Sequence, residues 1–264
     1  MGGAPDYPRL AREVLGITGA TVELARRLVA QALVIGDRRD EWRRTGARIV
    51  AAAPASSGVY VMRDASGLPL YVGKAVNLKR RLASHFSERR WRALKPEMAR
   101  AADVEWTEVG SELEALVREA SLIESMRPLV NVQQEIKPAD RRALTPALRR
   151  DVIVVLPSSD PDMATLIAAR VDGPTRIEQT RRNGADLAVH VRRLSRFFRS
   201  MRVDANEADQ TSALVFSWLA GRDAQATRLN PHDARTTHEL RARLAALVAD
   251  ASLFHERLDQ RMTL

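Results

Sequence analysis

Residues 58–74 read GVYVMRDASGLPLYVGK, and this stretch decides the fold of the chain around it. A polar tetrapeptide at residues 64–67, Asp-Ala-Ser-Gly, is typical of a turn. Val59 and Val61 alternate with other residues before the turn, and Leu70 and Val72 do so after it. Because successive side chains of a strand point to opposite faces of a sheet, this pattern predicts a β-hairpin.

The residues after the hairpin extend it into an α+β segment. A helix is expected from about Asn77, and the alternation from Asp103 to Val109 predicts a third strand. Ser111 and Glu114 stand three residues apart, which is the spacing of a capping box that opens another helix. Pro128 then limits that helix at its carboxy end.

The flanking regions divide the chain into four parts. Residues 1–55 carry apolar residues at spacings of three and four and are expected to form a helical segment. The hairpin and the elements after it make a domain at residues 56–133. Residues 134–150 are polar, contain proline and are expected to be a linker. Residues 151–264 begin with β-type runs and become mostly helical after residue 185, which predicts an α+β accessory unit.

The composition restricts the class of protein. Lysine and arginine number 42 against 33 acidic residues, and the formal net charge of +9 favours a polyanionic partner, nucleic acid first. The sequence has no cysteine, which excludes disulfides, thiolate zinc sites and cysteine nucleophiles. No apolar run approaches the roughly twenty residues that span a bilayer, and no apolar signal core opens the sequence. We therefore expect a cytoplasmic protein without a membrane partner.

The hairpin and the two predicted helices carry side chains that suit phosphodiester hydrolysis. That reaction needs an activated water, a cation that absorbs developing charge, and groups that orient both. The hairpin places the phenols of Tyr60 and Tyr71 on neighbouring strands. Arg81 and His85 are four residues apart and share one face of a helix. Glu119 lies beside the apolar stripe of the second helix, where a carboxylate can be held rigidly.

These motifs resemble those of the GIY-YIG nuclease superfamily, and most of all the amino-terminal nuclease module of the UvrC and Cho excinucleases. The family pattern is a GIY-type triplet, a YIG-type triplet with a lysine, an arginine with a histidine or tyrosine four residues later, a metal-binding glutamate on a helix, and then proline and asparagine. The matching residues here are Gly58-Val59-Tyr60, Tyr71-Val72-Gly73-Lys74, Asn77-Leu78, Arg81, His85, Glu114-Ala115, Glu119, Leu122-Ile123, Arg127-Pro128 and Asn131. The resemblance implies a three-stranded antiparallel sheet flanked by helices.

The resemblance also implies a metal-dependent mechanism. Glu119 would be the sole protein ligand of one Mg²⁺ or Mn²⁺, with waters and phosphate oxygens completing the shell as a hard cation prefers. Arg81 would hold the non-bridging phosphate oxygens, which its planar guanidinium suits. Asn131 would orient the nearby backbone or Tyr60.

The resemblance leaves the identity of the general base open. Tyr71 would activate the water, or would share that task with Tyr60. A free tyrosine ionises near a pKa of ~10, so the phenolate needs help at neutral pH. His85 or Lys74 could give that help by pairing with the phenolate.

Two groups of basic residues are candidates for contact with DNA phosphates. The first group lies in or near the helix expected after the hairpin and consists of Lys79, Arg80, Arg89, Arg90 and Arg92. The second lies opposite the apolar stripe of the helix expected from Leu187 to Met201 and consists of Arg192, Arg196 and Arg199. A basic, solvated helix face is the alternative interpretation of the second group.

The function that the resemblance favours is a structure- or damage-directed DNA endonuclease, making a single incision of the nucleotide-excision-repair type. Its substrate would be DNA, and other repair proteins are candidate partners. One alternative is a mobile-element or restriction nuclease that cuts intact duplex at a specific sequence. The other is a DNA-binding adaptor that keeps the nuclease fold without turnover.

Overall fold

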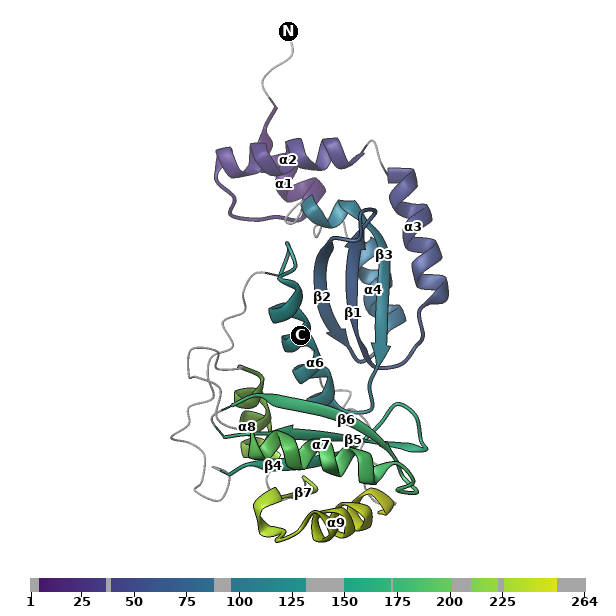
Figure 1. Cartoon of the computed structure of the whole chain (residues 1–264). Helices are drawn as coiled ribbons and strands as arrows, with labels where there is room; N and C mark the ends of the chain where they lie inside the picture. The colour runs from purple at the N-terminus through teal and green to yellow at the C-terminus, as the bar shows by residue number, and fades with distance from the viewer. Residues whose placement is uncertain are drawn as a thin grey trace. The chain divides into compact units, whose positions relative to one another are not determined.

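The structure is a computed structural model and describes residues 5–36, 39–87, 96–131, 150–171, 173–200, 210–222 and 226–250. The chain divides into two compact units, each with a β-sheet of its own (Figure 1). The first unit comprises Met1–Thr107 and Ser125–Gln133. The second unit comprises Glu108–Glu124 and Gln134–Leu264.

The first unit begins with helices α1 (Tyr7–Leu15), α2 (Val22–Gly36) and α3 (Arg39–Ala52). Asp6 caps α1 by accepting a hydrogen bond from the backbone N–H of the first turn, and Gly16 ends it with a left-handed φ of 68°. The core between α1 and α2 buries Leu15, Ala25, Leu28 and Val29 of the expected apolar stripe, together with Ala11. Val14 and Val22, which the apolar spacing also placed on the buried face, are exposed.

The sheet of the first unit consists of β1 (Gly58–Asp64), β2 (Pro69–Ala75) and β3 (Ala101–Glu108), in the order β2-β1-β3. Strands β1 and β2 are antiparallel and form the hairpin that the sequence predicts. In the turn, the Asp64 carboxylate accepts hydrogen bonds from the backbone N–H groups of residues 66 and 68. Gly67 has a φ of 87°, which only glycine adopts without strain.

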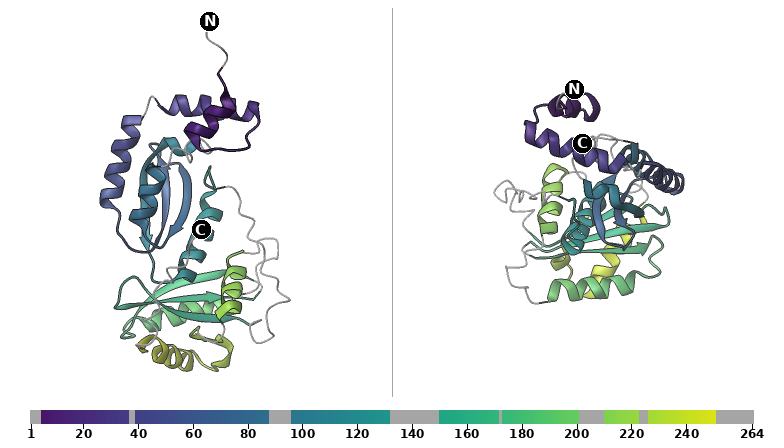
Figure 2. Two further views of the ribbon diagram at one scale, coloured as in Figure 1. Left: turned by 180° about the vertical axis from the view of Figure 1, so that it is seen from behind. Right: turned by 90° about the horizontal axis from the view of Figure 1, so that it is seen from above.

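Helix α4 (Leu78–Ser87) follows the hairpin and packs beside α3 (Figures 1 and 2). The Trp42 indole of α3 donates a hydrogen bond to the carbonyl of Phe86 at 3.0 Å, and the two rings lie 4.7 Å apart. A short 3-10 helix, η1 (Pro96–Arg100), leads into β3. The apolar side chains of α3, the sheet and α4 share one core, to which Trp42, Tyr60, Met62, Leu70, Leu78 and Leu82 belong.

The second unit is built on a four-stranded antiparallel sheet in the order β6-β5-β4-β7. Its strands are β4 (Val152–Pro157), β5 (Met163–Ala169), β6 (Thr175–Arg181) and β7 (Arg228–Leu229). Its other elements after β6 are α7 (Leu187–Arg199), α8 (Gln210–Arg222), η4 (Pro231–Asp233) and α9 (Thr237–Ala249).

Helices cover both faces of this sheet (Figure 2). Ile153 and Val155 pack with α7 and α9 on one face, whereas Val152, Val154 and Leu156 pack with α8 on the other. A strand that is buried on both faces needs a continuous apolar run, which explains why β4 lacks polar alternation. The expected α+β fold, with a helical amino-terminal segment and a β-then-helical carboxy-terminal part, is confirmed.

Helix α6 (Glu112–Met126) lies within residues 56–133, which the sequence suggested as one domain, yet most of it packs in the second unit. Leu113 and Val117 are buried in the same core as the apolar side chains of β4, β5 and α8. The sequence-based domain and the packing unit therefore overlap without coinciding. Of the expected linker at residues 134–150, only Arg150 lies within the described residues. Met201, the expected end of the helix from Leu187, lies outside them. None of the helices in the described part of the chain is long and apolar enough to cross a membrane.

Candidate active site

The strand register places Tyr60 and Tyr71 on the same face of the β1-β2 hairpin. Tyr60 pairs with Gly73, and Met62 pairs with Tyr71, so the two tyrosines are diagonal neighbours. Their ring centroids lie 6.0 Å apart. A Cβ atom at Gly73 would lie 2.7 Å from Tyr60 Oη and 2.7 Å from Tyr71 Cε1. The glycine of the second triplet is therefore required because the two phenol rings occupy the space of its side chain.

Helix α4 brings His85 against the tyrosine pair. His85 Nε2 and Tyr60 Oη are 2.5 Å apart and form a hydrogen bond. Tyr60 is fully buried and His85 is 3% exposed, whereas Tyr71 is half-buried. The imidazole centroid lies 5.7 Å from the ring of Tyr60 and 5.6 Å from that of Tyr71, in an edge-to-face arrangement with each. Tyr60 is thus enclosed by protein, and Tyr71 is the more accessible phenol.

Arg81 stands one helical turn before His85 and interacts with both phenols. Burial alone would lower the pKa of the Arg81 guanidinium, but its charge interaction and hydrogen bond with Tyr60, and then with Tyr71, raise that pKa above its usual value. The same interactions favour a negative charge on either phenol. Arg81 Nε is buried and has no hydrogen-bond partner among the described residues.

Asn131 links the chain segment after α6 to strand β2 by hydrogen bonds. The Val72 N–H donates to Asn131 Oδ1 at 2.7 Å, and Asn131 Nδ2 donates to the Val72 carbonyl at 2.8 Å. Asn131 therefore fixes the backbone between Tyr71 and Gly73, which is one of the two tasks expected of it. Lys74 pairs with Val59 in the register, and that pair belongs to the opposite face of the hairpin from the tyrosines.

Glu119 is carried by α6 and is half-buried. It lies in the part of α6 that belongs to the second unit, whereas the other six candidate catalytic residues belong to the first. No group of three or more histidine, aspartate or glutamate side chains that could hold a metal occurs in the part of the chain that the structure describes. A single carboxylate still suits Mg²⁺ or Mn²⁺, because these hard cations keep several waters and take phosphate oxygens as further ligands.

Glu114, at the start of α6, makes contacts beyond those of a helix-capping residue. Ser111 Oγ accepts a hydrogen bond from the Glu114 N–H at 3.2 Å, as expected of a cap. The Glu114 carboxylate is fully buried and bonds Thr165 Oγ1 of β5 at 3.1 Å. Thr165 is a partner that the sequence pattern did not predict. The one signal in the sequence was a threonine, the third residue, in the otherwise apolar strand from Met163 to Ala169.

Five of the eight candidate DNA-contacting residues can be located. Lys79 and Arg80 are exposed on α4, while Arg89, Arg90 and Arg92 lie outside the described residues. All three candidates on α7 are exposed: Arg192, Arg196 and Arg199. The opposite face of α7 is buried through Leu187, Val191, Leu194 and Phe198, as the amphipathic pattern predicts.

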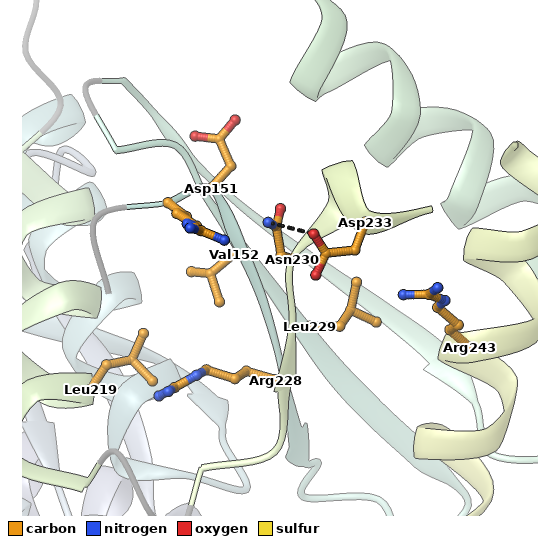
Figure 3. Close-up of a pocket in the computed structure, with 9 residues that line it drawn as sticks. Asp151, Val152, Leu219, Arg228, Leu229, Asn230, Asp233 and Arg243 are labelled. Carbon is orange, nitrogen blue, oxygen red and sulfur yellow. Dashed lines mark hydrogen bonds between the residues drawn. The ribbon is translucent and has the colours of Figure 1, made fainter. Parts of the chain in front are cut away.

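An open hollow of the second unit, shown in Figure 3, contains none of the candidate residues. Its polar lining consists of Arg150, Asp151, Arg228, Asn230, Asp233 and Arg243. The carboxylate of Asp151 pairs with His232 at 2.8 Å. Figure 3 shows the hydrogen bond at 3.0 Å that Asn230 donates to the Asp233 carboxylate. Both carboxylates that line the hollow therefore already have partners within the protein.

Residues 56–132 match the family described as the UvrC-like GIY-YIG domain. The UvrABC system protein C of Desulforudis audaxviator is 46% identical over 79 residues, which are 30% of this chain and 13% of that protein. The protein of the same name from Treponema denticola is 38% identical over 84 residues, 32% of this chain and 13% of the relative. The chain thus spans only about an eighth of the length of the curated relatives that it matches.

Solved structures of the GIY-YIG N-terminal endonuclease domain of UvrC from Thermotoga maritima also match. The structure bound to its catalytic divalent cation, magnesium, is 33% identical, covers 35% of this chain and 97% of that chain, and gives a TM-score of 0.30. A tyrosine-to-phenylalanine point mutant of the same domain is 32% identical over the same shares, with a TM-score of 0.30. The sequence matches identify residues 56–132 as a UvrC-like GIY-YIG domain, homologous to the amino-terminal nuclease domain of UvrC.

Proposed function

We propose that this protein is a metal-dependent DNA endonuclease that makes a single incision at a distorted or damaged site, as in nucleotide excision repair. The observation that carries the proposal is the cluster in which His85 bonds Tyr60 and the Arg81 guanidinium interacts with both phenols. A tyrosine pair that served packing alone would not need a half-buried cation that interacts with both phenols. The homology of residues 56–132 to the UvrC nuclease domain makes DNA the proposed substrate.

Tyr71 is the proposed general base, because water can reach it while Tyr60 is fully buried. Tyr71 would take a proton from the attacking water and become a phenolate. Arg81 stabilises that negative charge, and this favours proton transfer near neutral pH. Lys74 was the other candidate cation, but its register with Val59 leads us to assign the role to Arg81. Tyr60 and His85 are proposed to position Arg81 and Tyr71.

Arg81 also has the chemistry to hold the scissile phosphate. Its side chain is half-buried, so a phosphate can approach its accessible part. A planar guanidinium can bond two oxygens of one phosphate, which fixes orientation as well as charge. Asn131 would keep this arrangement rigid by holding the backbone next to Tyr71.

Glu119 is the proposed protein ligand for one Mg²⁺ or Mn²⁺. A bound ion of this kind supplies charge stabilisation at the phosphate and leaving oxygens. Glu119 fits that task because it is half-buried on a helix whose first turns are fixed in a core. The exposed Lys79 and Arg80 are proposed to contact flanking phosphates, together with Arg89, Arg90 and Arg92.

The decisive experiment incubates the purified protein with nicked, flapped, bulged, lesion-bearing and plain duplexes in the presence of Mg²⁺ or Mn²⁺. Glu119→Gln should abolish cleavage while DNA affinity remains. Glu124→Gln, the same change at an exposed position of α6, is the matched control and should cut normally. A Glu119→Gln variant that cuts at the wild-type rate would refute the assignment of the metal ligand.

The same panel separates the alternatives. Cleavage of intact duplex at one particular sequence would favour a mobile-element or restriction nuclease. Binding without cleavage on every substrate would favour a DNA-binding adaptor with an inactive nuclease fold. Incision that requires a further repair protein would leave the active-site assignment intact and identify a partner.

A further inference from the structure

We propose that the buried pair Glu114–Thr165 fixes the helix of the metal ligand to the carboxy-terminal sheet, which makes that sheet a positioning element for Glu119. The proposal rests on the proposed function for the role of Glu119. Its structural basis is independent of that role, because every contact involved lies within the second unit.

The carboxylate of Glu114 is completely enclosed, and both of its oxygens are bonded. Oε1 accepts from Arg118 Nε at 2.9 Å. Oε2 accepts from Thr165 Oγ1 at 3.1 Å and from the Gly110 N–H at 3.4 Å. A buried carboxylate is tolerated only where such donors replace water, so each donor restricts where the first turn of α6 can lie.

Thr165 is the donor that links the helix to the sheet. It is fully buried on β5 and pairs in register with Leu156 of β4. Leu156 belongs to the core that also contains Leu113 and Val117 of α6. The hydroxyl of Thr165 therefore lies on the sheet face that α6 covers, where it is the polar member of an otherwise apolar contact.

The segment that leads into α6 also contacts the same sheet. A Cβ atom at Gly110 would collide with the backbone of Pro157 and Ser158, so the two chain segments are in close contact there. Ser159 Oγ donates a hydrogen bond to the carbonyl of Glu108 at 3.3 Å. Glu119 follows Glu114 by five residues, or about 7 Å along a rigid helix. A shift of the first turn is consequently transmitted to the carboxylate of Glu119.

Thr165→Val tests the inference, since it keeps the branched shape and removes only the hydroxyl. Thr180→Val is the matched control. Thr180 is also fully buried in this sheet, and its hydroxyl donates to the Asp186 carboxylate at 2.7 Å, but it has no role in the α6 anchor. Both variants leave a carboxylate with one donor fewer, so both should lose comparable stability in urea unfolding.

Two further measurements separate the two variants. The first is amide hydrogen exchange along residues 112–124 without metal, and the second is Mn²⁺ affinity measured by the paramagnetic resonance of the free ion.

Thr165→Val should speed amide exchange in α6 several-fold and weaken Mn²⁺ binding several-fold. The loss should stay below the roughly 10- to 100-fold typical of groups that directly bond a metal ligand. Thr180→Val should leave both quantities at wild-type values. Thr165→Ser retains the hydroxyl and should restore Mn²⁺ affinity. Glu114→Gln, which keeps the shape and loses the charge, should behave like Thr165→Val.

Wild-type exchange and Mn²⁺ affinity in Thr165→Val would overturn the inference. Equal changes in Thr165→Val and Thr180→Val would also overturn it, because general loosening of the sheet would then be the cause. A failure of the proposed function gives a different pattern: Glu119→Gln would bind Mn²⁺ as well as wild type does. The exchange measurement on α6 would still decide whether the anchor exists.

Discussion

Tyr60 Oη lies 2.5 Å from His85 Nε2 with both side chains buried, whereas the neighbouring Tyr71 remains partly accessible. This difference in burial suggests different roles for two tyrosines that look equivalent in the sequence. A general base must reach the water that it activates. The accessible phenol is therefore suited to proton transfer, and the enclosed phenol to positioning.

Tyr71→Phe keeps the ring and deletes the hydroxyl, so the first prediction is a loss of cleavage with little loss of stability. General-base catalysis typically contributes about 10²- to 10⁴-fold, and a loss in that range is expected in single-turnover assays. Raising the pH should not restore the rate, because the ionising group is absent. Tyr60→Phe should cost less and keep the pH profile. The opposite ranking of the two variants would move the base role to Tyr60.

Arg81→Ala should reduce the cleavage rate by about a hundredfold or more, corresponding to the loss of about 2–4 kcal/mol of transition-state stabilisation. The reason is that Arg81 interacts with both phenols and is half-buried, so part of it can also approach the phosphate. Arg80→Ala removes the same charge from the exposed neighbour and should retain most activity. Equal losses in the two variants would mean that general charge, rather than position, determines the rate.

Gly73→Ala should disable the site without touching a catalytic group. The new methyl group would lie 2.7 Å from atoms of both Tyr60 and Tyr71, so at least one ring must move. We expect cleavage to collapse and the melting temperature to fall. Gly221→Ala is the control, because nothing lies within 4 Å of its Cβ and the residue is helical; its stability should stay equal or rise by up to about 1 kcal/mol. An active Gly73→Ala enzyme would show that the tyrosine geometry is not critical.

The hairpin and the catalytic spacing could be predicted because they depend on local sequence. A turn at residues 64–67 sets the register, and the register alone makes Tyr60 and Tyr71 neighbours. The anchoring of α6 could not be predicted, because Glu114 and Thr165 are 51 residues apart and a capping box explained the glutamate adequately. The two-residue strand β7 is too short to carry a periodic signal.

The turn of the hairpin should give the protein a specific acid sensitivity. Hydrogen bonds from Ser66, the Leu68 backbone and the Arg100 side chain outweigh the opposing effect of burial and lower the pKa of Asp64 to about 2 from its ordinary 3.8. Because the folded pKa lies below the unfolded one, the stabilisation is fully present above about pH 4 and is lost as the pH falls through about 2. The difference in unfolding free energy between wild type and Asp64→Asn should shrink over that interval. A difference that stays constant with pH would exclude the carboxylate as its source.

The last prediction concerns the exposed arginine face of α7, which we propose adds phosphate contacts to a small nuclease domain. Converting Arg192, Arg196 and Arg199 together to Gln leaves the buried face of α7 unchanged, so the fold should survive. Each phosphate contact contributes close to one unit to the slope of log affinity against log salt. If all three arginines contact DNA, the slope should therefore fall by roughly three, and by the same amount for every sequence, since phosphate contacts carry no base information.

A matched triple variant is available on the first two helices, where Arg9, Arg12 and Arg26 are equally exposed but already paired with glutamates. Converting these three to Gln changes the net charge by the same amount, yet it should leave the slope almost unchanged. The comparison separates contact from net charge, because a purely global effect would lower affinity similarly in both variants. An unchanged slope in the α7 variant would mean that its arginines form a solvated basic face and do not contact DNA. The cluster of Lys79, Arg80, Arg89, Arg90 and Arg92 would then be the main candidate for holding the duplex.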